Sequence, residues 1–89
     1  MKNKIVELIQ NSLAKLEIDG VDIHVETPKN TENGDFSSNV AMQLTRVLRK
    51  NPRVIAEEII SNIEEDEAVE KIEIAGPGFI NFFVKKSSL

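Results

Sequence analysis

Apolar residues recur at steps of three and four along three stretches of the chain, which is the spacing of one face of a helix. The first stretch covers residues 2–16, and its apolar side consists of Ile5, Leu8, Ile9, Leu13 and Leu16. The second follows a polar loop over residues 29–34, and its expected buried positions are Phe36, Val40, Leu44, Val47 and Leu48. The third begins at residue 52, and its inward-facing residues are Ile55, Ala56, Ile59, Ile60 and Ile63. The pattern predicts three amphipathic helices.

Polar residues and prolines mark the expected starts of the second and third helices. Asp35 or Ser37 can cap the second helix, because their side-chain oxygens accept hydrogen bonds from the first backbone N–H groups. Asn51 is a favoured cap for the third helix, and Pro52 suits its first position, where the missing N–H costs nothing.

Three other stretches predict strands. Residues 21–26 alternate apolar with polar side chains, which is typical of a half-buried strand and places His24 on its exposed face. Residues 69–74 form the next strand, and the turn signal Gly-Pro-Gly at residues 76–78 leads into the last one at residues 79–84. The order α-β-α-α-β-β predicts an α+β fold in which helices pack on one face of a small, mostly antiparallel sheet. We expect residues 1–89 to form a single domain.

The last predicted strand has two different faces, because successive side chains of a strand point in opposite directions. Ile80, Phe82 and Val84 share a purely apolar face that we assign to the core. The other face places Asn81 between Phe79 and Phe83. If this face is open, the rings can stack on an unpaired base and the amide can bond to the edge of the base. If it is buried, Asn81 is a structural residue satisfied by backbone groups.

Composition excludes several classes of chemistry. The chain has no cysteine and a single histidine, so it offers no disulfide, no zinc–thiolate site and no two-histidine metal site. No glycine-rich phosphate loop precedes a helix, and the acidic run at residues 64–67 fits a solvated helix exit better than a metal site. We therefore expect no catalysis, cofactor or metal in this chain alone. No apolar run approaches the length of a membrane span and no signal-like segment follows Met1, so we expect no membrane partner and a cytoplasmic location.

The net charge of −4 argues against broad, nonspecific binding of nucleic acid, but the charges are unevenly distributed. The acids crowd into residues 57–73, so one side of the domain could be basic and another acidic. The candidates for contacts with an RNA backbone are Lys29, Arg46, Arg49, Lys50, Lys85 and Lys86. Cations near a helix C-terminus also have a purely structural explanation, since they suit the helix dipole.

Four sequence segments, taken together, match a known family. They are Pro-Lys at residues 28–29, Gly-Asp-Phe-Ser-Ser-Asn-Val-Ala at 34–41, Lys-Asn-Pro at 50–52 with Ile-Ala at 55–56, and Ala-Gly-Pro-Gly-Phe-Ile-Asn-Phe at 75–82. In their order and spacing the chain resembles the N-terminal additional domain of arginyl-tRNA synthetases. The resemblance implies a domain ahead of a class I catalytic domain that touches the corner of the arginine-accepting tRNA and reads a D-loop base. It carries the family's base-contacting positions to Phe79 and Asn81, with Phe83 on the same face.

The resemblance also implies that ATP and arginine are handled by the catalytic domain in cis, which this chain lacks. Two other interpretations stay open. The last strand is similar to the aromatic strand of RNA-recognition motifs, although two consecutive helices and a leading helix do not fit that family's alternation. The chain could also be a protein–protein adaptor that uses Phe79 and Phe83 as anchors.

Overall fold

The computed structural model describes residues 1–85. The elements, in chain order, are α1 (Lys2–Lys15), β1 (Val25–Glu26), the 3₁₀ helix η1 (Thr31–Asn33), β2 (Phe36–Ser38), α2 (Val40–Gln43), α3 (Thr45–Leu48), α4 (Pro52–Ser61), β3 (Val69–Ala75) and β4 (Phe79–Val84). The predicted order of helices and strands is present, with the short strand β2 added between β1 and the second helical region. None of the helices in this part of the chain is long and apolar enough to cross a membrane.

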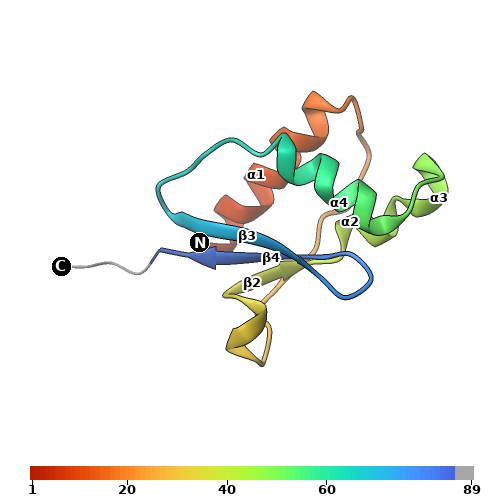
Figure 1. The fold of residues 1–89 in the computed structure, drawn as a ribbon. Coiled ribbons are helices and arrows are strands. Elements are labelled where there is room, and N and C mark those ends of the chain that lie inside the picture. The colour runs from red at the N-terminus through yellow and green to blue at the C-terminus, as the bar shows by residue number, and fades with distance from the viewer. Residues whose placement is uncertain (86–89) are drawn as a thin grey trace.

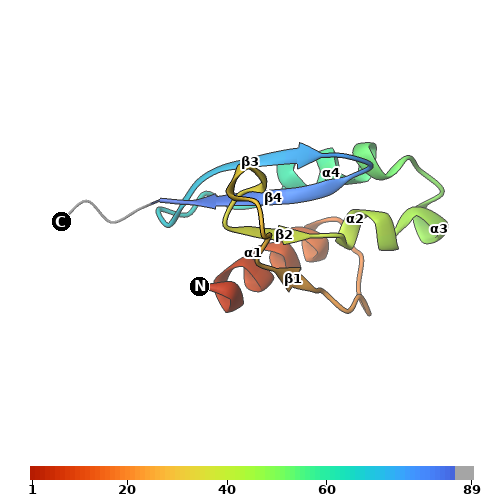
Figure 2. The same cartoon turned by 90° about the horizontal axis from the view of Figure 1, so that it is seen from below.

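The four strands form one antiparallel sheet with the order β1-β2-β4-β3. Helices α1, α2 and α4 lie on one side of this sheet, while the loop that carries η1 lies on the other (Figure 1). Viewed from below, β3 and β4 run alongside the shorter β2 and β1 (Figure 2). The predicted α+β class, with helices on one face of a small antiparallel sheet, is confirmed.

The core lies between the helices and the inner face of β4. Ile80 and Phe82 are fully buried there, against α1 residues such as Ile5 and α4 residues such as Ile59. Burial of apolar side chains in this layer is the main stabilising contribution, at about 25 cal/mol per Å² removed from water. The two long helices are also joined directly, since the buried Ser12 hydroxyl donates a hydrogen bond to the Ile59 carbonyl oxygen.

The third predicted helix is confirmed with its start signal. The Asn51 side-chain oxygen accepts a hydrogen bond from the Arg53 N–H at 2.9 Å, and Pro52 occupies the first helical position. The turn of this helix then directs Ile55 and Ile59 into the core.

The start of the second helix was predicted wrongly, because residues 36–38 form strand β2 instead. Asp35 does not cap a helix: its carboxylate accepts a hydrogen bond from the Val84 N–H at 2.8 Å, and its own N–H donates to the Phe82 carbonyl oxygen at 2.9 Å. Phe36 pairs with Phe82 across the sheet and so does not belong to a helical stripe. Pairing with β4, which lies distant in the sequence, overrides the local helical pattern.

Ser38, rather than Ser37, supplies the hydroxyl at the actual helix start, where its oxygen accepts a hydrogen bond from the Val40 N–H at 3.2 Å. The helical region is also divided at Leu44 into α2 and α3, each with four residues. This break shifts the helical phase, so Val47 is 72% exposed although the pattern predicted it to be buried.

The strand predicted over residues 21–26 is shorter than expected, since only Val25 and Glu26 pair with β2. The predicted alternation of burial nevertheless holds through the whole segment, and His24 is exposed as expected. The ladder is short because β2, its only neighbour in the sheet, has three residues.

Candidate nucleic-acid interface

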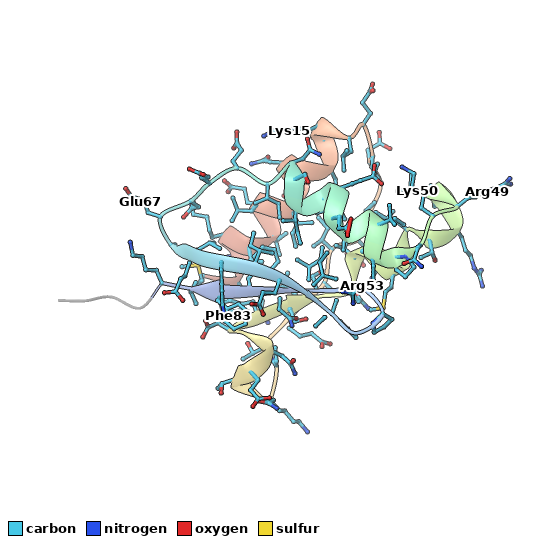
Figure 3. The ribbon with its side chains drawn as sticks, viewed as in Figure 1. Lys15, Arg49, Lys50, Arg53, Glu67 and Phe83 are labelled. Carbon is cyan, nitrogen blue, oxygen red and sulfur yellow. The ribbon has the colours of Figure 1, made fainter. Side chains whose placement is uncertain are left out.

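The outer face of β4 lies on the side of the sheet away from the helices, where Figure 3 shows Phe83 pointing outward. Phe79 is 39% exposed at the start of the strand, and Phe83 is half-buried near its end. Between them Asn81 is only 3% exposed, because its neighbours on β2 and β3 enclose it. The assignment of Ile80 and Phe82 to the core and of the two rings to the opposite face is confirmed.

Four polar residues form a row across the outer face, one from each strand. The register pairs Glu26 of β1 with Ser37 of β2, Ser37 with Asn81 of β4, and Asn81 with Glu73 of β3. Directly opposite residues of an antiparallel sheet have Cβ atoms about 4.5–5.5 Å apart, so these side chains are neighbours. Asn81 therefore lies between a hydroxyl and a carboxylate.

Asn81 is held by a side chain and not by backbone groups. The Ser37 hydroxyl donates a hydrogen bond to Asn81 Oδ1 at 2.8 Å. No buried side-chain nitrogen or oxygen in residues 1–85 lacks a hydrogen-bond partner, and the hydrogen bonds of that range include none from Asn81 Nδ2. Asn81 Nδ2 is thus not engaged by another residue of that range.

A hollow of about 400 Å³ opens beside Phe79 and Asn81 on this face. It lies between the loop after β1 and the β3–β4 turn, and its lining consists of Glu26, Pro28, Lys29, Asn33, Ser37, Ala75, Gly76, Pro77, Phe79 and Asn81. A much smaller hollow, which shares Phe79 with the first, is lined by His24, Glu26, Ser37, Asn39 and Phe79. The site thus offers a ring, an amide and the Lys29 ammonium around one recess.

The loop over residues 27–35 is fixed on β4 by a close approach at Gly34. A Cβ added there would lie 2.8 Å from the Phe82 carbonyl oxygen, and the φ of +88° is one that glycine adopts without strain. The next residue, Asp35, makes two hydrogen bonds to β4, one with the Phe82 carbonyl oxygen and one with the Val84 N–H. This contact places Lys29 and Asn33 at the rim of the hollow.

The β3–β4 turn that precedes Phe79 rests on the N-terminus of α4. A Cβ at Gly78 would lie 2.9 Å from Pro52 Cβ, so only glycine allows this packing. The Arg53 guanidinium donates a hydrogen bond to the Gly76 carbonyl oxygen at 2.5 Å. The Lys-Asn-Pro and Gly-Pro-Gly segments therefore meet in space, and Arg53, which was not among the candidates for backbone contacts, lies beside Gly76 of the hollow's lining.

The candidate cations are spread over the domain and do not gather at one point. Arg46 lies in α3, and Arg49 and Lys50 follow its end (Figure 3). Lys50 is paired with Glu58 at 2.9 Å. Lys29 lies at the hollow, and Lys85 is exposed beyond the far end of β4. Lys86 lies outside the described residues.

Lys71 is a second cation that the sequence analysis missed. Its Nζ lies 4.5 Å from the centroid of the Phe83 ring, within the range of a cation–π interaction, and 3.2 Å from the Glu73 carboxylate. A base that stacks on the outward face of Phe83 must displace or share this ammonium group. The alternation of β3 already placed Lys71 outward, but only the register with β4 shows which ring it covers.

Glu67, in the acidic run at residues 64–67, lies at the end of the molecule opposite Arg49 (Figure 3). Within it, the Asp66 carboxylate accepts a hydrogen bond from the Ala68 N–H and pairs with Lys4 at 3.0 Å. These contacts lower the pKa of Asp66, the backbone hydrogen bond being the larger cause. Across residues 1–85 no group of three or more potential ligand side chains could hold a metal ion.

Comparison with solved structures identifies the kind of protein that carries this fold. The arginyl-tRNA synthetase of Plasmodium falciparum matches 96% of this chain at 30% sequence identity and a TM-score of 0.82. The arginyl-tRNA synthetase of Thermus thermophilus matches the same share at 25% identity and the same TM-score. The chain covers 16% and 14% of these two structures. The fold is thus one found in aminoacyl-tRNA synthetases.

Sequence comparison defines the family. The model of the arginyl tRNA synthetase N terminal domain matches residues 3–84. Arginine–tRNA ligase 2 of Bacillus thuringiensis subsp. konkukian is 49% identical over the whole chain, and the arginine–tRNA ligase of Staphylococcus epidermidis is 42% identical. The chain belongs to the family of arginyl-tRNA synthetase N-terminal domains. It spans 17% of the length of these two curated relatives.

Proposed function

We propose that this chain is the tRNA-binding N-terminal domain of an arginine–tRNA ligase, and that the outer face of β4 reads a base of the tRNA D-loop. The proposal rests chiefly on the exposed Phe79 ring beside the Asn81 amide, since both residues border one hollow. An unpaired base offers a face for stacking and an edge for hydrogen bonds, and this site has a group for each. Family membership supports tRNA as the partner.

The rest of the enzyme follows from the same proposal. Residues 1–89 would form one domain ahead of a class I catalytic domain in cis, which binds ATP and arginine and works in the cytoplasm. The 17% share of the relatives' length supports a larger parent protein. In this proposal the chain contacts the corner of the tRNA, and the catalytic domain alone carries out the aminoacylation reaction.

The stacking role of Phe79 predicts a loss of tRNA binding without a loss of folding. Two residues along one strand face are about 6–7 Å apart, so a base on the Phe79 ring can direct its polar edge to Asn81. Phe79→Ala should weaken tRNA binding by about 1–3 kcal/mol whichever base occupies the D-loop position, because every base has a stacking face. Asn81→Ala should instead flatten the preference among bases, which isothermal titration with D-loop variants of the tRNA can measure.

Val47→Ala is the matched control for Phe79→Ala, since Val47 is also an exposed apolar residue but lies on α3. It should leave tRNA binding unchanged. If Phe79→Ala and Val47→Ala bind tRNA equally well, Phe79 does not stack on a base. If Phe79→Ala instead removes binding of a protein partner while tRNA binding persists, the exposed ring is the anchor of an adaptor surface.

The proposed backbone contacts predict a change in salt dependence. The logarithm of the binding constant falls with the logarithm of salt concentration by about 0.7–0.9 per phosphate neutralised. Lys29→Ala or Arg49→Ala should therefore reduce this slope by about one unit for each residue that contacts a phosphate. The same measurement applies to Arg46, Lys50, Lys85 and Lys86.

Lys15→Ala serves as the control for the slope, because Lys15 lies at the end of α1 and pairs with Glu64 at 3.6 Å. Its removal should leave the slope unchanged. An unchanged slope for all six candidate cations would mean that they are ordinary helix-end and surface charges.

A further inference from the structure

The two aromatic rings on the outer face of β4 have different neighbours on β3. Phe79 lies opposite Ala75, and Phe83 lies opposite Lys71. The small Ala75 side chain leaves the Phe79 ring exposed beside the hollow. Phe83, in contrast, is half-buried and has the Lys71 ammonium 4.5 Å from its ring centroid. Within residues 1–85, Phe79 is therefore the ring of this face that has no cation over it.

The Phe83 ring is also enclosed at its edge. A Cβ added at Gly34 would lie 3.4 Å from Phe83 Cε1, so the loop before β2 lies against the ring. A base that approached the ring would have to displace the Lys71 ammonium and give up its cation–π contact. Phe83 is for this reason a poor platform for a base, although it shares the outer face with Phe79.

Lys71 is the only lysine or arginine in the four strands of the described sheet. Its ammonium is held from two sides, by the Phe83 ring and by the Glu73 carboxylate at 3.2 Å. Lys71 and Glu73 are both exposed, and an exposed ion pair of this kind is weak. A phosphate can therefore replace Glu73 as the anionic partner while the ammonium stays on the ring.

Lys71 lies on the same face of the sheet as the proposed stacking ring. Phe79 and Phe83 are four residues apart along β4, which corresponds to about 13 Å. Proteins that bind unpaired strands combine rings for the bases with cations that follow the backbone. Lys29 borders the hollow beside Phe79, and Lys71 lies beyond Asn81 toward the end of β4. The backbone of an RNA chain that crosses this face thus has a cation on the sheet itself.

We propose that Phe83 is not a second stacking ring but supports the Lys71 ammonium, which contacts a phosphate next to the base that stacks on Phe79. The site then reads one base, and the contact at Lys71 positions the backbone without distinguishing the bases. The inference rests on the proposed function, because it assumes that RNA covers the outer face of β4.

Lys71→Met removes the charge but keeps an unbranched side chain over Phe83. If Lys71 contacts a phosphate, the slope of log binding constant against log salt concentration should become shallower by about 0.7–0.9. A fourfold rise in salt should then weaken tRNA binding by about threefold less in the variant than in the wild type. The change should be the same for every D-loop base, and Lys71→Arg should restore the slope. Isothermal titration at several salt concentrations measures these effects.

Lys15→Met is the matched control. Lys15 is also an exposed lysine that pairs with a glutamate, Glu64 at 3.6 Å, but it lies on α1. Its replacement should leave the slope unchanged. Equal slopes for Lys71→Met, Lys15→Met and the wild type would overturn the phosphate contact.

Two further variants distinguish a supporting ring from a stacking ring. Lys71→Ala uncovers Phe83, and it should bind tRNA as weakly as Lys71→Met because both lack the charge. Phe83→Leu keeps an apolar side chain beneath Lys71 and should weaken binding by no more than Lys71→Met does. A base stacked on Phe83 would make Phe83→Leu cost roughly five- to hundredfold in affinity, and Lys71→Ala would bind more tightly than Lys71→Met. Either result would overturn the supporting role.

The same titrations separate this inference from the proposed function. If Phe79→Ala weakens tRNA binding but Lys71→Met keeps the wild-type slope, the base site stands and the role of Lys71 fails. If Lys71→Met shows the shallower slope but Phe79→Ala binds normally, the phosphate contact stands and the stacking role of Phe79 fails. If the wild-type chain binds no tRNA, the proposed function fails and this inference fails with it.

Discussion

Phe82→Ala is expected to destabilise the domain by about 3–5 kcal/mol, which is the usual cost of truncating a buried phenylalanine. Phe82 is fully buried on the inner face of β4, where it packs against the helices that cover the sheet. The truncation removes the apolar contacts of the ring and leaves a cavity that the surrounding strands cannot close, because Phe82 is paired on both sides by Phe36 and Ile72. Urea denaturation followed by circular dichroism measures the change.

Phe79→Ala provides the matched comparison, since it removes the same ring from the same strand. Phe79 is 39% exposed on the opposite face, so its truncation should change the free energy of unfolding much less. Most substitutions at exposed positions stay within about 0.5 kcal/mol. If Phe79→Ala unfolds the domain and Phe82→Ala leaves it stable, the two faces of β4 are inverted relative to the structure.

Gly34→Ala is expected to destabilise the domain by about 2–4 kcal/mol, from two additive causes. A non-glycine residue at φ +88° is strained by about 1–3 kcal/mol, and the added Cβ would lie 2.8 Å from the Phe82 carbonyl oxygen. The clash involves backbone on both sides, so it can be relieved only by moving the loop away from β4. That movement would stretch the hydrogen bonds that Asp35 makes to Phe82 and Val84.

Gly20→Ala separates the two causes. Gly20 has a similar φ of +71°, but a Cβ there would meet nothing within 4 Å. Its replacement should therefore cost only the backbone strain. Chemical denaturation of both variants tests the expectation, and equal losses would mean that the close approach at Gly34 contributes nothing. Since Gly34 also places Lys29 at the hollow, we expect Gly34→Ala to weaken tRNA binding and Gly20→Ala to leave it unchanged.

Local sequence signals predicted the helices and strands correctly wherever periodicity or capping within the segment determines its structure. The stripe of α1, the Asn51–Pro52 start of α4 and the alternating burial of residues 21–26 appear as expected, and Ile80 and Phe82 of β4 face the core. Each follows from periodicity or capping within a few residues, because a helix or strand that lies on a core must present its apolar side to it. The α+β class and the division of β4 into two faces could be predicted in this way, whereas the alternation left open whether the face with Phe79 is exposed.

The errors and omissions fall where residues distant in the sequence meet. Residues 36–38 have a helical pattern, yet pairing with β4 makes them a strand, and the break at Leu44 turns Val47 outward. Tertiary pairing overrides weak local preferences because it satisfies backbone groups along a whole strand.

The sequence by itself determined which side chains of β4 share a face, and its segments 28–29, 34–41, 50–52 with 55–56, and 75–82 together indicated the family. The tertiary structure alone decided which residues surround the outer side chains of β4. Only the register across the sheet places Ser37 against Asn81 and Lys71 over Phe83, and only the close approaches at Gly34 and Gly78 bring Lys29 to the hollow and Arg53 to the β3–β4 turn. The physical reason is that side-chain alternation is a property of one strand, whereas hydrogen-bond partners are set by strands and loops that are distant along the chain.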